Sequence, residues 1–341
     1  MPENIVADNP RADADGAGGA LPVLCLLVPC YNEEAIIADS LARMTAKMDE
    51  WRRAGMVADE SFCCFVDDGS ADNTWALLAQ HLQAPHRALK LAFNAGHQNA
   101  LHAGISHIKD ACDCCVSIDA DLQDDMDAVP LMLAARKRGA AVVYGVREER
   151  GSDSFFKRNT ARLFYRLSSV LGVPGRAHHA DFRLTDKLVM RALAAFDERH
   201  LYWRGLLPSL GFRAETVEYA RSPRIGGETK YPAGKMLLLA FNGITSFSVM
   251  PLRIIMLLGL MISAAAMLGG AWFFVNTLFY GGEWPQGWAS LIISLYFLGG
   301  IILMSLGIIG EYVGKIFIES KKRPLYVVEK TRQGGVESAS Q

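Results

Sequence analysis

The sequence predicts an α/β domain with a mostly parallel sheet, followed by interfacial helices and a two-helix transmembrane hairpin. Short apolar runs alternate with amphipathic stretches from residue 21 to about residue 146, which is the pattern of repeated βα units. Two runs without a charged residue then follow at residues 254–280 and 284–310. Each run exceeds the roughly 20 residues that cross a bilayer, although a pair of buried core helices is the alternative.

The first part of the chain contains five expected strands and four expected helices. The strands are expected at residues 24–29, 62–66, 88–92, 114–118 and 141–146, and the helices at residues 34–53, 74–82, 98–109 and 128–137. Ligands of such sheets bind in the crevice beyond the carboxyl ends of the strands. Because Asn32, Asp67 and Asp119 each follow one of these strands, we expect them to converge on one cleft.

Three carboxylates and an amide follow the apolar run at 114–118, namely Asp119, Asp121, Gln123 and Asp124. Asp119 and Asp121 are two residues apart, so an extended segment directs both side chains to one face. Oxygen ligands of this kind suit Mg²⁺ or Mn²⁺ better than zinc. The pattern therefore predicts a divalent cation bound together with a phosphate-bearing ligand.

Composition excludes several classes of function. The formal net charge is -1, so no strongly basic field exists to bind a nucleic acid backbone. The seven cysteines are odd in number and lie mostly in apolar runs, which argues against a disulfide framework and for buried thiols in a reducing cytoplasm. A zinc site at Cys112, Cys114 and Cys115 would lack a second pair of ligands at the usual spacing.

The segments on either side of the α/β domain indicate its orientation. Residues 1–20 have neither a basic start nor an apolar core, which is typical of a disordered tail and not of a signal peptide. Lysines and arginines flank the predicted hairpin but are absent from the loop between its helices, so the positive-inside rule places both ends in the cytoplasm. The expected segments are a tail at 1–20, a cytoplasmic α/β domain at 21–230, an interfacial amphipathic segment at 231–251, the hairpin at 252–312 with spans near 253–280 and 286–311, and a cytoplasmic C-terminal tail at 313–341.

Four motifs carry a resemblance to a known family: PCYNE at 29–33, VDDGS at 66–70, NAG at 94–96 and DADLQD at 119–124. In this order they resemble the inverting glycosyltransferases of family 2, which implies the Rossmann-like GT-A fold. The later motifs ADFRL at 180–184, WRG at 203–205, GETKY at 227–231 and GEYVG at 310–314 resemble the polyprenyl-phosphate branch, which contains bactoprenol glucosyltransferases and dolichyl-phosphate mannose synthases.

The resemblance implies a role for individual residues. Contacts with the nucleotide-sugar are implied for Pro29, Tyr31, Glu33, Asp67, Asp68, Asn94 and Asp119. The metal ligands implied are Asp119, Asp121 and Gln123, and the contacts with a lipid phosphate are Arg147, Arg158, Arg162, Arg204 and Lys230. Asp121 and Arg147 are the implied catalytic residues. The alternatives are an Asx turn at Asp67 and Asp68, a solvated basic helix over 153–171, and structural ion pairs for Arg204 and Lys230.

The resemblance also implies an activity. We expect metal-dependent transfer of a hexose, with UDP-glucose as the favoured donor, to undecaprenyl phosphate at the cytoplasmic face of the bacterial inner membrane. A phosphate monoester has a second pKa of about 6, so this acceptor is already nucleophilic and needs no dedicated base. GDP-mannose, UDP-GlcNAc and amino-arabinose donors stay open, as do a processive polysaccharide synthase and a non-catalytic membrane scaffold. The oligomeric state is also open, although small residues such as Gly259 are compatible with a homo-oligomer.

Overall fold

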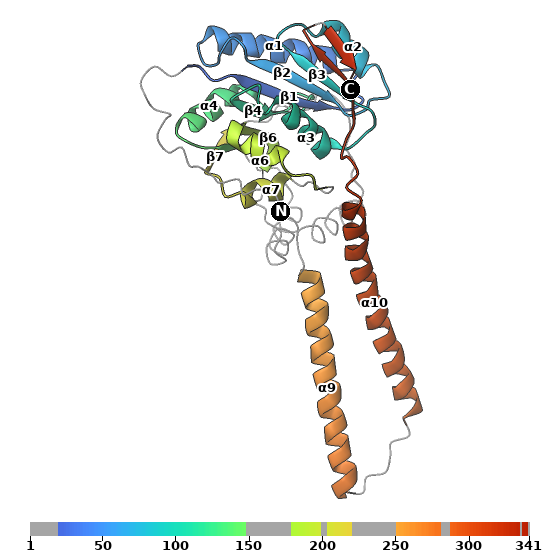
Figure 1. Cartoon of the computed structure of the whole chain (residues 1–341). Coiled ribbons are helices and arrows are strands. Elements are labelled where there is room, and N and C mark those ends of the chain that lie inside the picture. Colours follow the sequence, from blue (N-terminus) through green and yellow to red (C-terminus); the bar gives the residue numbers. More distant parts are fainter. Residues whose placement is uncertain are drawn as a thin grey trace.

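A nine-stranded sheet forms the centre of the α/β domain in the computed structural model, which describes residues 20–147, 179–198, 203–219, 250–280, 287–334 and 336–339. The order of the strands is β7-β5-β6-β4-β1-β2-β3-β8-β9. Helices cover both faces of the sheet, and two long helices extend away from it (Figure 1).

The first half of the domain alternates strands and helices as the sequence predicts. Its elements are β1 (Leu24–Cys30), α1 (Ile37–Arg53), β2 (Phe62–Asp67), α2 (Thr74–His81), β3 (Arg87–Leu91), α3 (His97–Ile108), β4 (Cys114–Ser117), the 3-10 helix η1 (Met126–Ala128), α4 (Val129–Lys137) and β5 (Val142–Arg147). Strands β1, β2, β3 and β4 pair in parallel, so their carboxyl ends meet at one edge of the sheet. The expected parallel core is confirmed.

The second half adds strands to both sides of this core. Its elements are β6 (His179–Asp186), α6 (Lys187–Ala194), α7 (Trp203–Ser209), β7 (Ala214–Tyr219), α9 (Met250–Tyr280), α10 (Trp288–Ser320), β8 (Val328–Gln333) and β9 (Val336–Ala339). Strand β6 runs antiparallel to both β4 and β5, whereas β7 runs parallel to β5. The flanks of the sheet are therefore mixed, while its centre is parallel.

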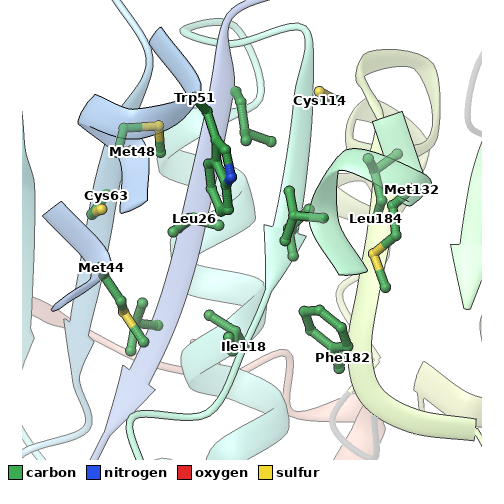
Figure 2. Packing of buried hydrophobic residues seen from close by; sticks show 14 of the residues in the cluster. Leu26, Met44, Met48, Trp51, Cys63, Cys114, Ile118, Met132, Phe182 and Leu184 are labelled. Carbon is green, nitrogen blue, oxygen red and sulfur yellow. The ribbon is translucent and has the colours of Figure 1, made fainter. Parts of the chain in front are cut away.

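The core lies in two layers, one on each face of the sheet. Side chains of α1, α2 and α4 pack against one face, and those of α3, α6 and α7 against the other. Figure 2 shows part of the first layer, where Met44, Met48 and Trp51 of α1 pack over Leu26 of β1. Every residue of β1 is buried, as expected for a central parallel strand that is covered on both faces.

All seven cysteines are buried residues of these layers, which confirms the expectation of buried thiols. Burial raises the pKa of each of Cys25, Cys30, Cys63, Cys64 and Cys114, and it raises that of Cys63 to about 12. These thiols are therefore protonated at neutral pH and poorly reactive.

Helices α9 and α10 lie side by side and project from the α/β domain (Figure 1). Large apolar side chains along both helices are exposed, and examples are Met256, Trp272, Leu303 and Ile316, each at least 60% exposed. Within the described residues, Phe297–Ser320 is the helical segment that is long and apolar enough to cross a membrane, and α9 contributes the shorter apolar segment Leu252–Ile262. The second span therefore stays a prediction.

The C-terminal segment differs from the tail expected at 313–341. Helix α10 continues to Ser320, and β8 then pairs with β3 in the central sheet. Leu325 and Tyr326, between α10 and β8, pack against the α3 side of the core, and Lys90 of β3 forms an ion pair with Glu329 of β8 at 3.1 Å. The sequence signal was weak because these strands are polar.

Several expected segments lie outside the described residues. These are the N-terminal tail up to residue 19, the basic helix expected at 153–171 and the interfacial segment from 231 to 249.

Candidate active site

A cleft of about 330 Å³ opens at the carboxyl ends of β1, β2 and β4, beside the start of α3. The predicted site residues that line it are Pro29, Tyr31, Glu33, Asp68, Asn94, Asp119 and Asp121. Gly96, His97 and Ala100 complete its α3 side. The loops after the parallel strands therefore meet at one cleft as expected, but Asn32 and Asp67 are not among its lining residues.

The acidic turn, defined as residues 119–124, follows β4 and forms one wall of the cleft. Leu122 adopts a positive φ of 55°, which reverses the chain, and the backbone N–H of Gln123 donates to Asp121 Oδ1 at 3.2 Å. From α1, the Ser40 hydroxyl donates to the carbonyl of Ala120 at 2.5 Å. Asp119 and Asp121 line the cleft, whereas Gln123 is buried within the turn.

Negative charge accumulates in this wall. Burial raises the pKa of Asp119, the carboxylates of Asp124, Asp181 and Asp121 raise it further, and His97 opposes the shift. Such an excess of carboxylates fits a divalent cation that takes its remaining ligands from the phosphates of a substrate. No group of three or more His, Cys, Asp or Glu side chains in the described part of the chain is arranged to hold a metal by itself.

The loop after β2 is fastened to the loop after β3. Asp68 accepts hydrogen bonds from the backbone N–H groups of Ala95 at 2.7 Å and Gly96 at 2.9 Å, while burial raises its pKa. Gly69 has a φ of +69°, and a Cβ at this position would lie 2.5 Å from the carbonyl carbon of Phe93. Only glycine allows the two loops to approach this closely.

Asp67 lies beneath the cleft rather than in its lining. Its side chain is fully buried, and its Oδ1 accepts a hydrogen bond from the Ser70 backbone N–H at 3.1 Å. Its Oδ2 is also buried, and no group among the described residues donates to it. Burial raises the pKa of this carboxyl. The hydrogen bond to Ser70 spans three residues, whereas an Asx turn joins residues two apart, so the Asp67 side chain fastens the loop to Ser70 without forming the Asx turn considered from the sequence.

A carboxylate held by two arginines lies at the other edge of the cleft. Asp181 on β6 accepts from Arg183 Nη2 at 2.5 Å and from Arg204 Nη2 at 3.1 Å, and His97 Nε2 is 3.7 Å away. Burial raises the pKa of Asp181, but Arg183 and Arg204 outweigh it, so the pKa lies below its ordinary value. Arg183 is 3% exposed, which makes this the most deeply buried guanidinium at the site.

The remaining predicted residues are those assigned to the lipid phosphate. Arg204 forms the structural ion pair that the sequence left as an alternative, and its role toward a lipid phosphate stays a prediction. Arg147 ends β5, but its side chain is not described, and Arg158, Arg162 and Lys230 lie outside the described residues.

Sequence reasoning missed Ser40 and Tyr219 as residues that hold the acidic turn, because the chain separates them from it by 80 and 95 residues. Asp181 and Arg183 did carry a signal, since charges two residues apart in an apolar strand point to one face. Their partners across the sheet were not deducible from that signal.

Comparison with known proteins identifies the class. The family described as Glycosyl transferase family 2 matches residues 25–198. The uncharacterized glycosyltransferase YkoT of Bacillus subtilis (strain 168) is 46% identical over 90% of this chain and 91% of its own length. The prophage bactoprenol glucosyl transferase homolog of Escherichia coli (strain K12) and the bactoprenol glucosyl transferase of Shigella phage SfII are each 34% identical over 91% of this chain and 99% of their own length.

The chain belongs to glycosyl transferase family 2 and is a transferase enzyme. Its fold is the GT-A-like α/β fold that the resemblance implied, with a parallel core beneath the cleft.

Proposed function

We propose that the protein transfers a hexose from a nucleotide-sugar, with UDP-glucose favoured, to undecaprenyl phosphate, and inverts the anomeric centre. The observation that carries this proposal is the cleft in which the loops after β1, β2, β3 and β4 meet. Relatives that span nearly the same length and are named bactoprenol glucosyl transferases support the acceptor and the sugar.

The donor side of the cleft suits a nucleotide. Tyr31 lines it with 45% of its surface exposed, which leaves an aromatic face available for stacking on a base. Asp67, whose carboxylate is buried, is assigned to the nucleotide through the loop that it fastens at Ser70. Asp68, Asn94 and Glu33 complete this side.

Asp119, Asp121 and Gln123 would hold Mg²⁺ or Mn²⁺ against the diphosphate of the donor. When bound, the cation supplies positive charge that offsets the charge developing on the leaving nucleoside diphosphate. Through that cation, the carboxylates of the acidic turn would orient the diphosphate of the donor.

The acceptor side needs cations more than it needs a base. A lipid phosphate carries close to two negative charges at neutral pH, so its oxygen attacks without losing a proton to the enzyme. Bidentate arginine contacts hold and orient such a group. We assign this task to Arg147, Arg158, Arg162, Arg204 and Lys230. Asp181, whose low pKa keeps it ionised, orients Arg204 beside the cleft.

The path of the chain supports a membrane hairpin with both ends on the catalytic side. Helices α9 and α10 lie between β7 and β8, and both of these strands belong to the same sheet. A chain that leaves a sheet, enters a bilayer and returns to the same sheet crosses that bilayer an even number of times. We therefore propose two spans, a cytoplasmic catalytic domain with both termini on its side, and a location in the bacterial inner membrane.

A panel of radiolabelled donors tests the proposal. Purified full-length protein in lipid vesicles is incubated with undecaprenyl phosphate and with UDP-glucose, UDP-GlcNAc, GDP-mannose or an amino-arabinose donor in turn. Label from UDP-glucose is expected in the lipid fraction. Label from a different donor would replace the assigned sugar and keep the reaction, whereas transfer only to a free saccharide would favour a processive synthase. Nucleotide-sugar binding without any turnover would support a scaffold and contradict the proposal.

A further inference from the structure

Tyr219, the last residue of β7, contacts the acidic turn at a distance of 95 residues along the chain. Its hydroxyl donates a hydrogen bond to Asp124 Oδ1 at 2.5 Å. Tyr219 is 3% exposed and Asp124 is 4% exposed, so water competes little for this bond.

The ring of Tyr219 is held in a defined position by packing. Phe182 of β6 contacts it edge-on, with ring centres 5.1 Å apart and an interplanar angle of 73°. Gly145 of β5 lies close to both rings, because a Cβ there would be 2.7 Å from Phe182 Cδ1 and 3.0 Å from Tyr219 Cε1. The hydroxyl is therefore presented to Asp124 from a rigid support.

Asp124 is not used to cap the following helix. The side chain that caps η1 is that of Asp125, whose Oδ1 accepts from the Asp127 backbone N–H at 2.9 Å. The Asp124 carboxylate accepts the hydrogen bond of Tyr219 instead. Among the described residues, Ser40 of α1 thus holds the start of the acidic turn and Tyr219 of β7 holds its end.

We propose that Tyr219 is a positioning residue which, through Asp124, holds the acidic turn in the shape that binds the divalent cation and the nucleotide diphosphate. The inference rests on the proposed function of that turn. Without the hydroxyl, the buried end of the turn loses this hydrogen bond to the sheet, and the carboxylates of Asp119 and Asp121 are held less firmly in one geometry. Residues that orient metal ligands in this way typically change metal affinity by 10–100-fold when they are mutated.

The test uses Tyr219→Phe, which removes the hydroxyl and keeps the ring that packs on Phe182. Binding of Mn²⁺ to the full-length protein with UDP present is followed by the electron paramagnetic resonance signal of free Mn²⁺. The dissociation constant for Mn²⁺ is expected to rise by about 10-fold or more. Tyr326→Phe is the matched control, because Tyr326 packs on His102 on the α3 side of the core, and its Mn²⁺ affinity should equal that of the wild type.

A double-mutant cycle shows whether Tyr219 acts through Asp124. In an Asp124→Ala background, Tyr219→Phe should add little further loss of Mn²⁺ affinity, whereas losses that simply add would contradict the mechanism. Unchanged Mn²⁺ affinity in Tyr219→Phe, with the wild type binding Mn²⁺, overturns the inference and leaves the proposed function intact. A wild type that binds no Mn²⁺ with UDP instead overturns the metal part of the proposed function. Should Tyr219→Phe fail to fold, Asp124→Ala removes the same hydrogen bond from its other partner, and unchanged Mn²⁺ affinity there contradicts the inference.

Discussion

Arg183 offers the sharpest test of how the edge of the cleft is built. Its guanidinium is buried and lies 2.5 Å from Asp181 Oδ1, and Arg204 contributes a second, half-exposed contact at 3.1 Å. Removing one partner of a buried ion pair costs about 3–5 kcal/mol, because the other charge stays buried and uncompensated. Since Arg204 remains beside Asp181, Arg183→Met should cost about 3 kcal/mol, at the lower end of that range.

The measurement is urea denaturation of the detergent-solubilised protein, followed by tryptophan fluorescence. Arg191→Met is the matched control, because Arg191 forms an ion pair with Asp110 at 2.8 Å in which both side chains are more than half exposed. That control should cost no more than about 1 kcal/mol. Adding Asp181→Asn to Arg183→Met should restore part of the lost stability. If Arg183→Met costs no more than Arg191→Met, the reasoning about the buried pair is refuted.

Three further predictions follow from the site and the core. Asp121→Asn should lower the rate of glycosyl transfer by about 100-fold or more, with little change in the free energy of unfolding. Asp125→Asn, outside the cleft, is the control and should keep transfer near the wild-type rate. Equal activity of the two variants in the radiolabel assay would contradict the role of Asp121. Burial lowers the pKa of His86 from 6.5 to about 4. The unfolded chain thus takes up a proton before the folded chain does, and stability should fall by about 3 kcal/mol as the pH drops from 6.5 to 4. Urea titrations at both pH values should show that His86→Gln loses less stability than the wild type over this range. An identical pH dependence of the two proteins would contradict the assignment to His86. Gly69→Ala should destabilise more than Gly55→Ala, because both glycines have positive φ but only Gly69 meets backbone atoms within 3 Å; equal melting temperatures would refute the contact.

Sequence patterns predicted the parallel core because its strands are continuous apolar runs. The apolar runs at residues 24–29 and 62–66 predict buried strands, and both runs do form them. In a parallel sheet, the turns that follow such strands lie at one edge. This is why most of the predicted donor residues do line the cleft.

The sequence did not predict the features that depend on contacts between residues far apart in the chain. The pairing of β8 with β3 arises from polar strands whose pattern also suits a solvated tail, so only the packing of Leu325 and Tyr326 and the register against β3 reveal it. In the same way, a tyrosine at 219 carries no sign of its partner at 124 until the order of β5, β6 and β7 is known.

The central claim is that the acidic turn and a divalent cation drive sugar transfer to a lipid phosphate. Its most direct test is the transfer of label from UDP-glucose to undecaprenyl phosphate by the purified protein, before and after exhaustive chelation. We predict that chelation stops the transfer and that Mg²⁺ or Mn²⁺ restores it. Undiminished transfer after chelation, or label that never enters the lipid, would contradict the claim.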